Sequence, residues 1–257
     1  MTPFAALHHQ DAPLLLPNAW DHASAAALAA RGFAAIGTTS LGVAAAGLAD
    51  GAGTSRAETL LLARRLGRGA FLLSVDAEGG FSDDPAAVAE LAGELAAAGA
   101  VGVNLEDGRA DGTLTPAALH AAKIAAVKAA VPDLFVNART DTHWLGVPDP
   151  VEETAQRLTL YQQAGADGVF VPGLTEEEGI AALAGSVRVP LNILYSPTGP
   201  TLSRLGELGV RRVSLGSLLF RSALEAAVRT AVDVRENRTP TGRPPSYAEV
   251  QRLTGSD

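Results

Sequence analysis

Short apolar segments alternate with longer Ala- and Leu-rich segments of helical period along the chain. Gly, Pro, Asn or Asp bounds each apolar segment, which is typical of strands buried in a parallel sheet. The eight expected strands are LLLPN from Leu14, AAIGTT from Ala34, FLLSVDAE from Phe71, VGVNLED from Val101, LFVNART from Leu134, GVFVP from Gly168, LNILYS from Leu191 and RRVSLG from Arg211. Eight strand-helix units in roughly 250 residues predict an α/β fold, a (β/α)8 TIM barrel.

The segments between the strands carry the signals of helix ends. Asp21 precedes HASAAALAARG as an expected N-cap, and Gly32 follows as a C-cap. Thr115 and Pro116 open another helix, and Gly99 closes the one before it. The local signals therefore agree with the repeating pattern.

The last predicted helix is interrupted by a polar segment with three prolines, RENRTPTGRPPSYAEVQ. Proline removes a backbone donor and clashes with the preceding helical turn, so the helix should stop before this segment. We therefore expect a barrel domain at residues 1–235 and a C-terminal arm at residues 236–257. The arm should contain a short helix that packs on a neighbouring subunit.

The composition narrows the class of protein. With 257 residues, 47% of them hydrophobic and 19% charged, the chain suits a globular core rather than a disordered segment. Cysteine is absent, which excludes disulfides, thiolate metal sites and cysteine nucleophiles. The formal net charge is −8 without a cluster of Lys and Arg, which argues against nucleic acid as a partner.

The N-terminal sequence and the remaining basic residues exclude further classes. No apolar run reaches the roughly 18 residues of a membrane helix, and MTPFAALHHQDAP lacks the features of a signal peptide. We expect a cytoplasmic protein without a membrane partner. Lys123 and Lys128 fall inside a predicted helix, which argues against Schiff-base chemistry. No histidine has metal-ligand spacing: His8 and His9 are expected in a frayed terminus and His120 on a helix surface.

Polar residues end several of the predicted strands, where a barrel of this kind has its active site. Asp76 and Glu78 are two residues apart on one face and offer hard oxygen ligands suited to Mg²⁺. Asn104 and Glu106 share a face in the same way. A carboxylate at a strand end often caps a helix instead, but several such groups at neighbouring strand ends favour a functional site.

Two further strand ends offer groups that bind anions. Arg139 follows an apolar strand and could clamp a carboxylate with two hydrogen bonds. Thr39 and Ser40 in GTTSLG offer hydroxyls and backbone N–H groups for a carboxylate or a developing enolate oxygen. The sequence therefore predicts a metal site beside an anion site.

Six motifs together resemble the isocitrate lyase and phosphoenolpyruvate mutase superfamily: PNAWDHASA, GTTSLGVAAAGLADG, SVDAEGG, VNLEDG, NARTD and AGADGVFVPG follow that family's order over the whole barrel. The resemblance implies a (β/α)8 barrel that uses Mg²⁺, with Mn²⁺ as a substitute. It also implies a homo-oligomer, a dimer or homotetramer that exchanges C-terminal helices.

The resemblance also implies roles for individual residues. Asp76 matches the Mg²⁺ ligand, and Glu78 and Glu106 match acids that hold metal-bound water. Asp50 matches an acid near the metal waters, and Arg139 matches the arginine that binds substrate. The residues that match the loop around the oxo-carboxylate end of the substrate are Thr39, Ser40 and Leu41.

Departures from the family pattern narrow the chemistry. Lyases of the family carry a loop with a catalytic Cys after the fourth strand, whereas this chain has EDGRADGTLTP and no Cys. Members that process phosphonates carry a His after the sixth strand, where this chain has Pro172. Ser196, Thr198 and Ser214 stand near positions that bind a distal carboxylate in the lyases. A turn that uses SPTGP for its geometry explains the first two equally well.

These observations favour a Mg²⁺-dependent lyase-type enzyme that cleaves a carbon-carbon bond in a small 2-oxo or hydroxy dicarboxylate through an enolate. An oxaloacetate-like or 2-oxoglutarate-like acid would fit. Asp50, Glu106 and Arg139 are the expected catalytic residues. The alternatives are a phosphonopyruvate mutase or hydrolase, a barrel that binds oxo acids without turnover, and a phosphate site at Gly216 and Ser217.

Overall fold

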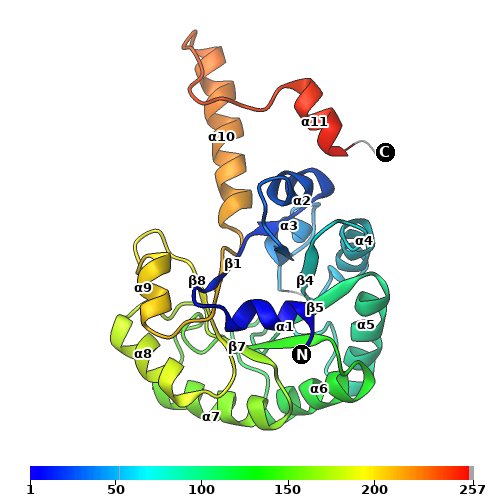
Figure 1. Ribbon diagram of the computed structural model, residues 1–257, viewed down its shortest axis with the longest axis vertical. Coiled ribbons are helices and arrows are strands. Elements are labelled where there is room, and N and C mark those ends of the chain that lie inside the picture. Colours follow the sequence, from blue (N-terminus) through cyan, green and yellow to red (C-terminus); the bar gives the residue numbers. More distant parts are fainter. Residues whose placement is uncertain (52, 255–257) are drawn as a thin grey trace.

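The computed structural model describes residues 1–51 and 53–254, and its strands form one nearly closed barrel of parallel strands with helices between them (Figure 1). All eight predicted strands are present, so the (β/α)8 TIM-barrel prediction is confirmed. The strands are β1 (Leu14–Leu16), β2 (Asn18–Ala19), β3 (Ala35–Thr38), β4 (Leu72–Asp76), β5 (Ala100–Glu106), β6 (Phe135–Arg139), β7 (Gly168–Phe170), β8 (Leu191–Leu194) and β9 (Arg212–Ser214).

The first predicted strand is divided at Pro17 into β1 and β2. β1 pairs with β9, while β2 pairs with β3, so the two halves join the two ends of the sheet. Pro17 has no N–H for a sheet ladder, but its carbonyl accepts a hydrogen bond from Gly37 N at 2.8 Å. The division therefore closes the barrel around a residue that cannot donate.

The helices begin and end where the local signals predict. Asp21 caps α2 with a reciprocal pair of hydrogen bonds to Ser24, and Gly32 and Gly99 have the positive φ of residues that end helices. The helices are α1 (Pro3–Ala6), the 3₁₀ helix η1 (Leu7–His9), α2 (His22–Ala29), α3 (Ser40–Ala44), α4 (Arg56–Leu66), α5 (Pro85–Ala97), α6 (Ala117–Ala130), α7 (Pro150–Gln163), α8 (Glu177–Ser186), α9 (Leu202–Glu207), α10 (Leu218–Arg235) and α11 (Tyr247–Thr254).

The amino-terminal end of the barrel is closed by α1 and η1. Phe4 is fully buried against Phe135, and the His8 ring stacks on Phe135 with 4.4 Å between centroids. The expectation of a frayed terminus is therefore wrong. The apolar ring of Phe4 at the open end of the barrel recovers enough burial to order the segment.

His120 also lies in the core rather than on a helix surface. Its side chain is fully buried on α6, where it packs edge-on against Tyr161 of α7 at 4.7 Å. α6 packs against both α5 and α7. More of its surface is therefore buried than in a helix that packs along a single stripe. The expectation of an exposed His120 is wrong for this reason.

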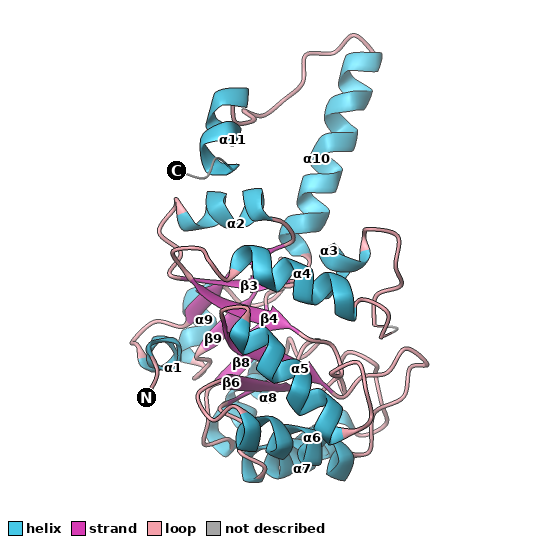
Figure 2. Cartoon of the chain, turned by 90° about the vertical axis from the view of Figure 1, so that its right-hand side faces the viewer, coloured by secondary structure: helices cyan, strands magenta, loops and turns pink. Residues whose placement is uncertain are grey.

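α10 does not cover the barrel but projects away from it, and α11 returns toward α2 (Figures 1 and 2). α10 ends at Arg235, the predicted end of the barrel domain, and residues 255–257 of the predicted arm lie outside the described residues. The two helices leave large apolar side chains exposed, among them Leu224, Val228, Val234 and Tyr247. Among the helices that the structure describes, none is both long and apolar enough to cross a bilayer.

Candidate active site

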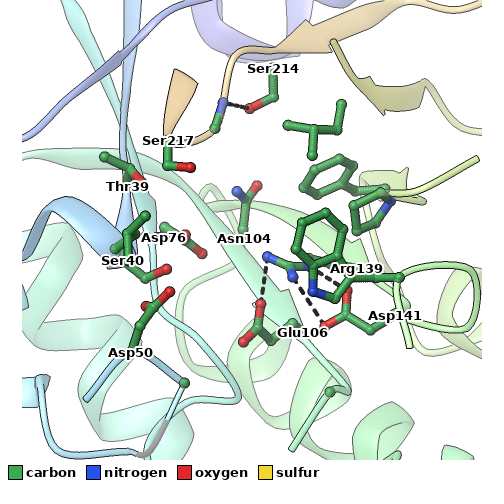
Figure 3. Close-up of a pocket in the computed structure, with 18 of the residues that line it drawn as sticks. Thr39, Ser40, Asp50, Asp76, Asn104, Glu106, Arg139, Asp141, Ser214 and Ser217 are labelled. Atoms are coloured by element: carbon green, nitrogen blue, oxygen red, sulfur yellow. Dashed lines mark hydrogen bonds and ion pairs between the residues drawn. The ribbon is translucent and has the colours of Figure 1, made fainter. Parts of the chain in front are cut away.

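A pocket of about 300 Å³ opens at the carboxyl ends of the strands, on the opposite side of the barrel from α1. Its lining combines carboxylates, one arginine deep in the site, and an apolar wall (Figure 3). The carboxylates are those of Asp50, Asp76, Glu106 and Asp141. The structure thus brings together side chains from four strand ends and their loops, as the sequence predicted.

Asp76 ends β4 and is held by the loop after β3. Its Oδ2 accepts a hydrogen bond from Ser40 N at 3.2 Å, and its own N donates to Thr38 Oγ1 at 2.9 Å. Its Oδ1 is buried and has no hydrogen-bond partner among the described residues. A buried carboxylate oxygen without a donor is costly unless a cation binds it, so Asp76 fits a Mg²⁺ ligand.

The pocket carries more negative than positive charge. Burial raises the pKa of Asp50, with the Asp76 charge adding to the rise and the Ser40 hydroxyl opposing it. Burial also raises the pKa of Glu106 to about 8, although Arg139 opposes the shift. A divalent cation would offset this excess of carboxylates.

The carboxylates are not gathered around one point. In the part of the chain that the structure describes, no three or more Asp, Glu, His or Cys side chains form a ready metal cluster. Mg²⁺ usually keeps several waters and uses only one or two carboxylates. The donor set therefore fits an ion held directly by Asp76, with Asp50 and Glu106 as acceptors for its waters.

Glu78 lies beside the pocket rather than in its lining. Ser55 Oγ donates to Glu78 Oε1, and Gly53 N donates to Oε2 at 3.3 Å, in a neighbouring hollow that Lys123 also lines. β4 ends at Asp76, and Glu78 has a φ of 48°, so the two-residue alternation of the strand does not extend to it. The shared face expected from the sequence therefore stops at the strand end.

Arg139 is held by two carboxylates. Its Nη1 lies 2.6 Å from Glu106 Oε2, while its Nε and Nη2 donate to Asp141 at 2.6 and 3.1 Å. The guanidinium also stands 5.7 Å from the centroid of the Phe170 ring. Burial disfavours its charge, but Glu106 and Asp141 hold its pKa above the ordinary value. Arg139 is therefore a fixed cation at the pocket.

Asp107 positions this arrangement from behind and was missed by the sequence analysis. Its fully buried carboxylate accepts hydrogen bonds from Asp141 N at 2.9 Å, Tyr161 Oη at 2.6 Å and Arg157 Nη1 at 3.0 Å. It thereby ties the end of β6 to α7. The consecutive acids of VNLEDG were the available signal, since neighbouring strand residues face opposite sides.

The loop after β5 is a short hairpin with its own hydrogen bonds. Gly108 and Leu114 form an antiparallel bridge, and Arg109 N donates to Thr113 O at 2.9 Å. Arg109 Nη2 also lies 2.8 Å from Asp83 Oδ2 beyond the end of β4. The EDGRADGTLTP segment is thus held in place by these contacts, and its residues Gly108 and Arg109 line the pocket.

The remaining predicted residues divide into two groups. Thr39, Ser40, Leu41 and Ser214 line the pocket, as do Gly216 and Ser217 before α10. Ser196 and Thr198 instead form an exposed turn in which their hydroxyls are 3.1 Å apart. The wall near β7 and β8 is apolar and consists of Trp144, Leu145, Phe170, Pro172 and Leu194.

Comparisons with known proteins agree with this fold. The family model described as phosphoenolpyruvate phosphomutase matches residues 4–235. An uncharacterised protein of Mycobacterium tuberculosis is 45% identical over 96% of this chain and 94% of its own. An oxaloacetate decarboxylase of Pseudomonas savastanoi pv. phaseolicola is 33% identical over 64% of this chain and 59% of its own.

A solved structure from Burkholderia cenocepacia, described only as a lyase/mutase, superposes with a TM-score of 0.89. It is 35% identical and covers 98% of this chain and 94% of its own. The chain belongs to the phosphoenolpyruvate phosphomutase family, within the superfamily that includes isocitrate lyase. It is an enzyme of a superfamily that contains lyases, hydrolases and mutases.

Proposed function

We propose that the protein is a Mg²⁺-dependent lyase-type enzyme that cleaves a carbon-carbon bond in a small 2-oxo or hydroxy dicarboxylate. The observation that carries the proposal is the pairing, across one pocket, of the unpartnered Asp76 Oδ1 with the fixed cation Arg139. A 2-oxo acid has a carboxylate that Arg139 could bind and an oxo oxygen that could reach a metal ion held by Asp76. The similarity to an oxaloacetate decarboxylase supports an oxaloacetate-like substrate.

The anion site of the proposal is formed by Arg139 together with the loop after β3. Thr39, Ser40 and Leu41 line the same pocket, and since the Ser40 N–H donates to Asp76, the Thr39 hydroxyl and the Leu41 N–H would serve the anion. Such donors act best where negative charge develops, because fixed dipoles need no reorganisation during the reaction. Here that charge develops on the oxo oxygen when the carbon next to the oxo group loses its bond to the following carbon and the electron pair passes into an enolate.

Mg²⁺, when bound, would withdraw electron density from the oxo group and so stabilise the enolate. Asp76 would hold it directly, and Asp50 and Glu106 would act on its waters. Glu78, bonded to Ser55 and Gly53 beside the pocket, would add its negative charge to the metal side. Burial raises the pKa of Glu106 against the opposing charge of Arg139, so its carboxylate could accept a proton from a water in the site and pass it to the enolate carbon. Arg139 would keep both the substrate carboxylate and Glu106 in place.

The proposal extends to the assembly. We propose that α10 and the arm at residues 236–257 pack on another subunit in a homo-oligomer, a dimer or tetramer. The exposed apolar side chains of α10 support this, since the helix touches its own barrel only near its start, where Phe220 packs on Trp20, and its outer part can be buried by a neighbour. A distal carboxylate of the substrate would meet Ser214 rather than the exposed turn of Ser196 and Thr198.

The test is oxalate binding by calorimetry, with Mg²⁺ and then with a chelator. Oxalate is planar and dianionic like the enolate of pyruvate. We expect binding that requires Mg²⁺, followed by release of CO₂ or cleavage products from oxaloacetate in a substrate panel. Absence of oxalate binding in both conditions would contradict the proposal, and consumption of phosphonopyruvate would favour the phosphorus-carbon branch. Binding without turnover of any acid would indicate a binding barrel.

A further inference from the structure

Asn104 lies on β5 at the centre of the pocket, between Asp76 and Arg139 (Figure 3). Its register partner on β4 is Asp76, and its register partner on β6 is Asn137. The side chain is 5% exposed, so almost all of its surface is in contact with protein. A ligand that contacts both Asp76 and Arg139 would therefore lie near this amide.

The orientation of the Asn104 amide follows from the chemistry of its neighbours. Arg212 Nη2 lies 3.1 Å from Asn104 Oδ1, and Asn137 Nδ2 lies 2.9 Å from the same oxygen. A guanidinium has donors and no acceptor, so the atom that faces Arg212 must be the oxygen. The nitrogen is thereby directed to the other side.

That nitrogen has no hydrogen-bond partner among residues 1–51 and 53–254, although Asn104 lines the pocket. We propose that Asn104 Nδ2 donates a hydrogen bond to an oxygen of the bound oxo acid, and that Arg212 and Asn137 are positioning residues that hold the amide in this orientation. The inference rests on the proposed function and adds a neutral donor between the metal side and the cation side.

Arg212 is unusual as a core residue. It is 1% exposed on β9, and its Nε and Nη1 have no partner within the described part of the chain. Burial lowers its pKa to about 9, so it still carries a positive charge at neutral pH. A buried cation with few acceptors costs stability, and an apolar side chain of similar size would cost less. The hydrogen bond by which Arg212 orients the Asn104 amide gives this arginine a role besides packing.

The test measures oxalate binding in the presence of Mg²⁺ for the wild type and matched variants. Asn104→Asp keeps an oxygen for Arg212 but removes the donor, and Asn104→Ala removes both. We expect both to weaken oxalate binding by about tenfold to a hundredfold, the usual range for a hydrogen bond to a charged group. Wild-type affinity in both variants would overturn the proposal.

Asn192→Ala is the matched control. Asn192 is a fully buried asparagine on β8 in register with Arg212, but it does not line the pocket. Its loss creates a similar cavity, so oxalate affinity should stay within about twofold even if the protein is destabilised. The unfolding temperature of each variant, measured alongside, separates lost binding from lost folding.

The positioning role is tested by Arg212→Met, which keeps the length of the side chain and removes its donors. We expect weaker oxalate binding although Arg212 does not reach the pocket, and partial recovery in Arg212→Lys. Because the effect acts through Asn104, Arg212→Met should add little to Asn104→Ala in the double variant. Wild-type affinity in Arg212→Met, or additive losses in the double variant, would overturn the positioning role.

A wild type that binds no oxalate would contradict the proposed function without deciding the orientation of Asn104. In that case the side-chain amide protons of Asn104 decide it, by their exchange with solvent in nuclear magnetic resonance spectra of ¹⁵N-labelled protein. Protons that face the pocket should exchange rapidly. Protection comparable to that of the buried Asn137 amide would overturn the inference.

Discussion

Arg139 Nη1 lies 2.6 Å from Glu106 Oε2, between two residues that are also register partners on β5 and β6. Strand register therefore places the two residues opposite each other, and their side chains form the ion pair. Its two members stand at the carboxyl ends of adjacent strands, where both reach the pocket. Parallel pairing thus places a guanidinium and a carboxylate next to each other in the lining of the pocket.

Arg139→Lys should weaken oxalate binding by about tenfold or more. The guanidinium of Arg139 contacts Glu106 and Asp141 and still has N–H groups left for a substrate carboxylate. Lysine keeps the positive charge but lacks this planar set of donors. Calorimetry with Mg²⁺ measures the change. Arg204→Lys, an exposed arginine paired with Glu177, is the control and should bind as the wild type does. Equal affinity of both variants would remove Arg139 from the anion site.

Asp76→Asn should abolish the binding of oxalate that requires Mg²⁺. The carboxylate with the unpartnered Oδ1 becomes an amide, which keeps the size of the side chain but is a poor ligand for a hard cation. Titration of Mg²⁺ and thermal unfolding with and without the metal measure the effect. Asp133→Asn removes an exposed carboxylate and serves as the control. Retained metal-dependent binding in Asp76→Asn would assign the metal to other residues.

Tyr161→Phe should destabilise the protein by about 1.5–3 kcal/mol, because it leaves the buried Asp107 carboxylate without one of its donors. Chemical denaturation measures this change. Tyr247→Phe removes the hydroxyl of an exposed tyrosine and should change stability by less than about 0.5 kcal/mol. Equal effects of the two substitutions would show that the Asp107 network contributes nothing specific.

The contribution of His120 and His8 to stability should fall when the pH drops from about 6.5 toward 4, while the raised pKa of Glu106 acts in the opposite direction. Burial lowers the pKa of His120 to about 4 and that of His8 to about 3, so the unfolded chain binds protons first as the pH falls. The full contribution is present above the unfolded pKa of about 6.5 and is lost below it, on the order of 3 kcal/mol for His120. His120→Phe should reduce the slope of unfolding free energy against pH. An unchanged slope would contradict the assignment.

Val228→Glu on the exposed face of α10 should shift the protein to a smaller assembly. The side chain is 64% exposed in the single chain, so a charge there is harmless unless the face packs on another subunit. Light scattering after size-exclusion chromatography measures the mass. Arg229→Glu is the control, because it changes the charge at the next position of the same helix without removing an apolar side chain. A monomeric wild type would contradict the proposed helix exchange.

The sequence by itself determined the order of the eight strand-helix units and the polar residues that lie near the strand ends. Apolar strands, helix caps and helix-ending glycines depend on contacts within a few residues, so signals such as Asp21 before α2 can be read from the chain. The topology of a parallel barrel then places every strand end at one rim. Asp76, Glu106 and Arg139 could be assigned to one pocket on this basis alone.

Tertiary packing decided the features that depend on contacts between distant segments. Glu78 lies outside the pocket because its backbone has left the strand conformation. His8 and His120 are buried by residues distant in the sequence, which the local sequence pattern does not indicate. The orientation of Asn104 depends on Arg212, 108 residues further along the chain. Which donors face which acceptors in a barrel core is settled only when all strands are in register, because each pairing fixes the directions left to the next.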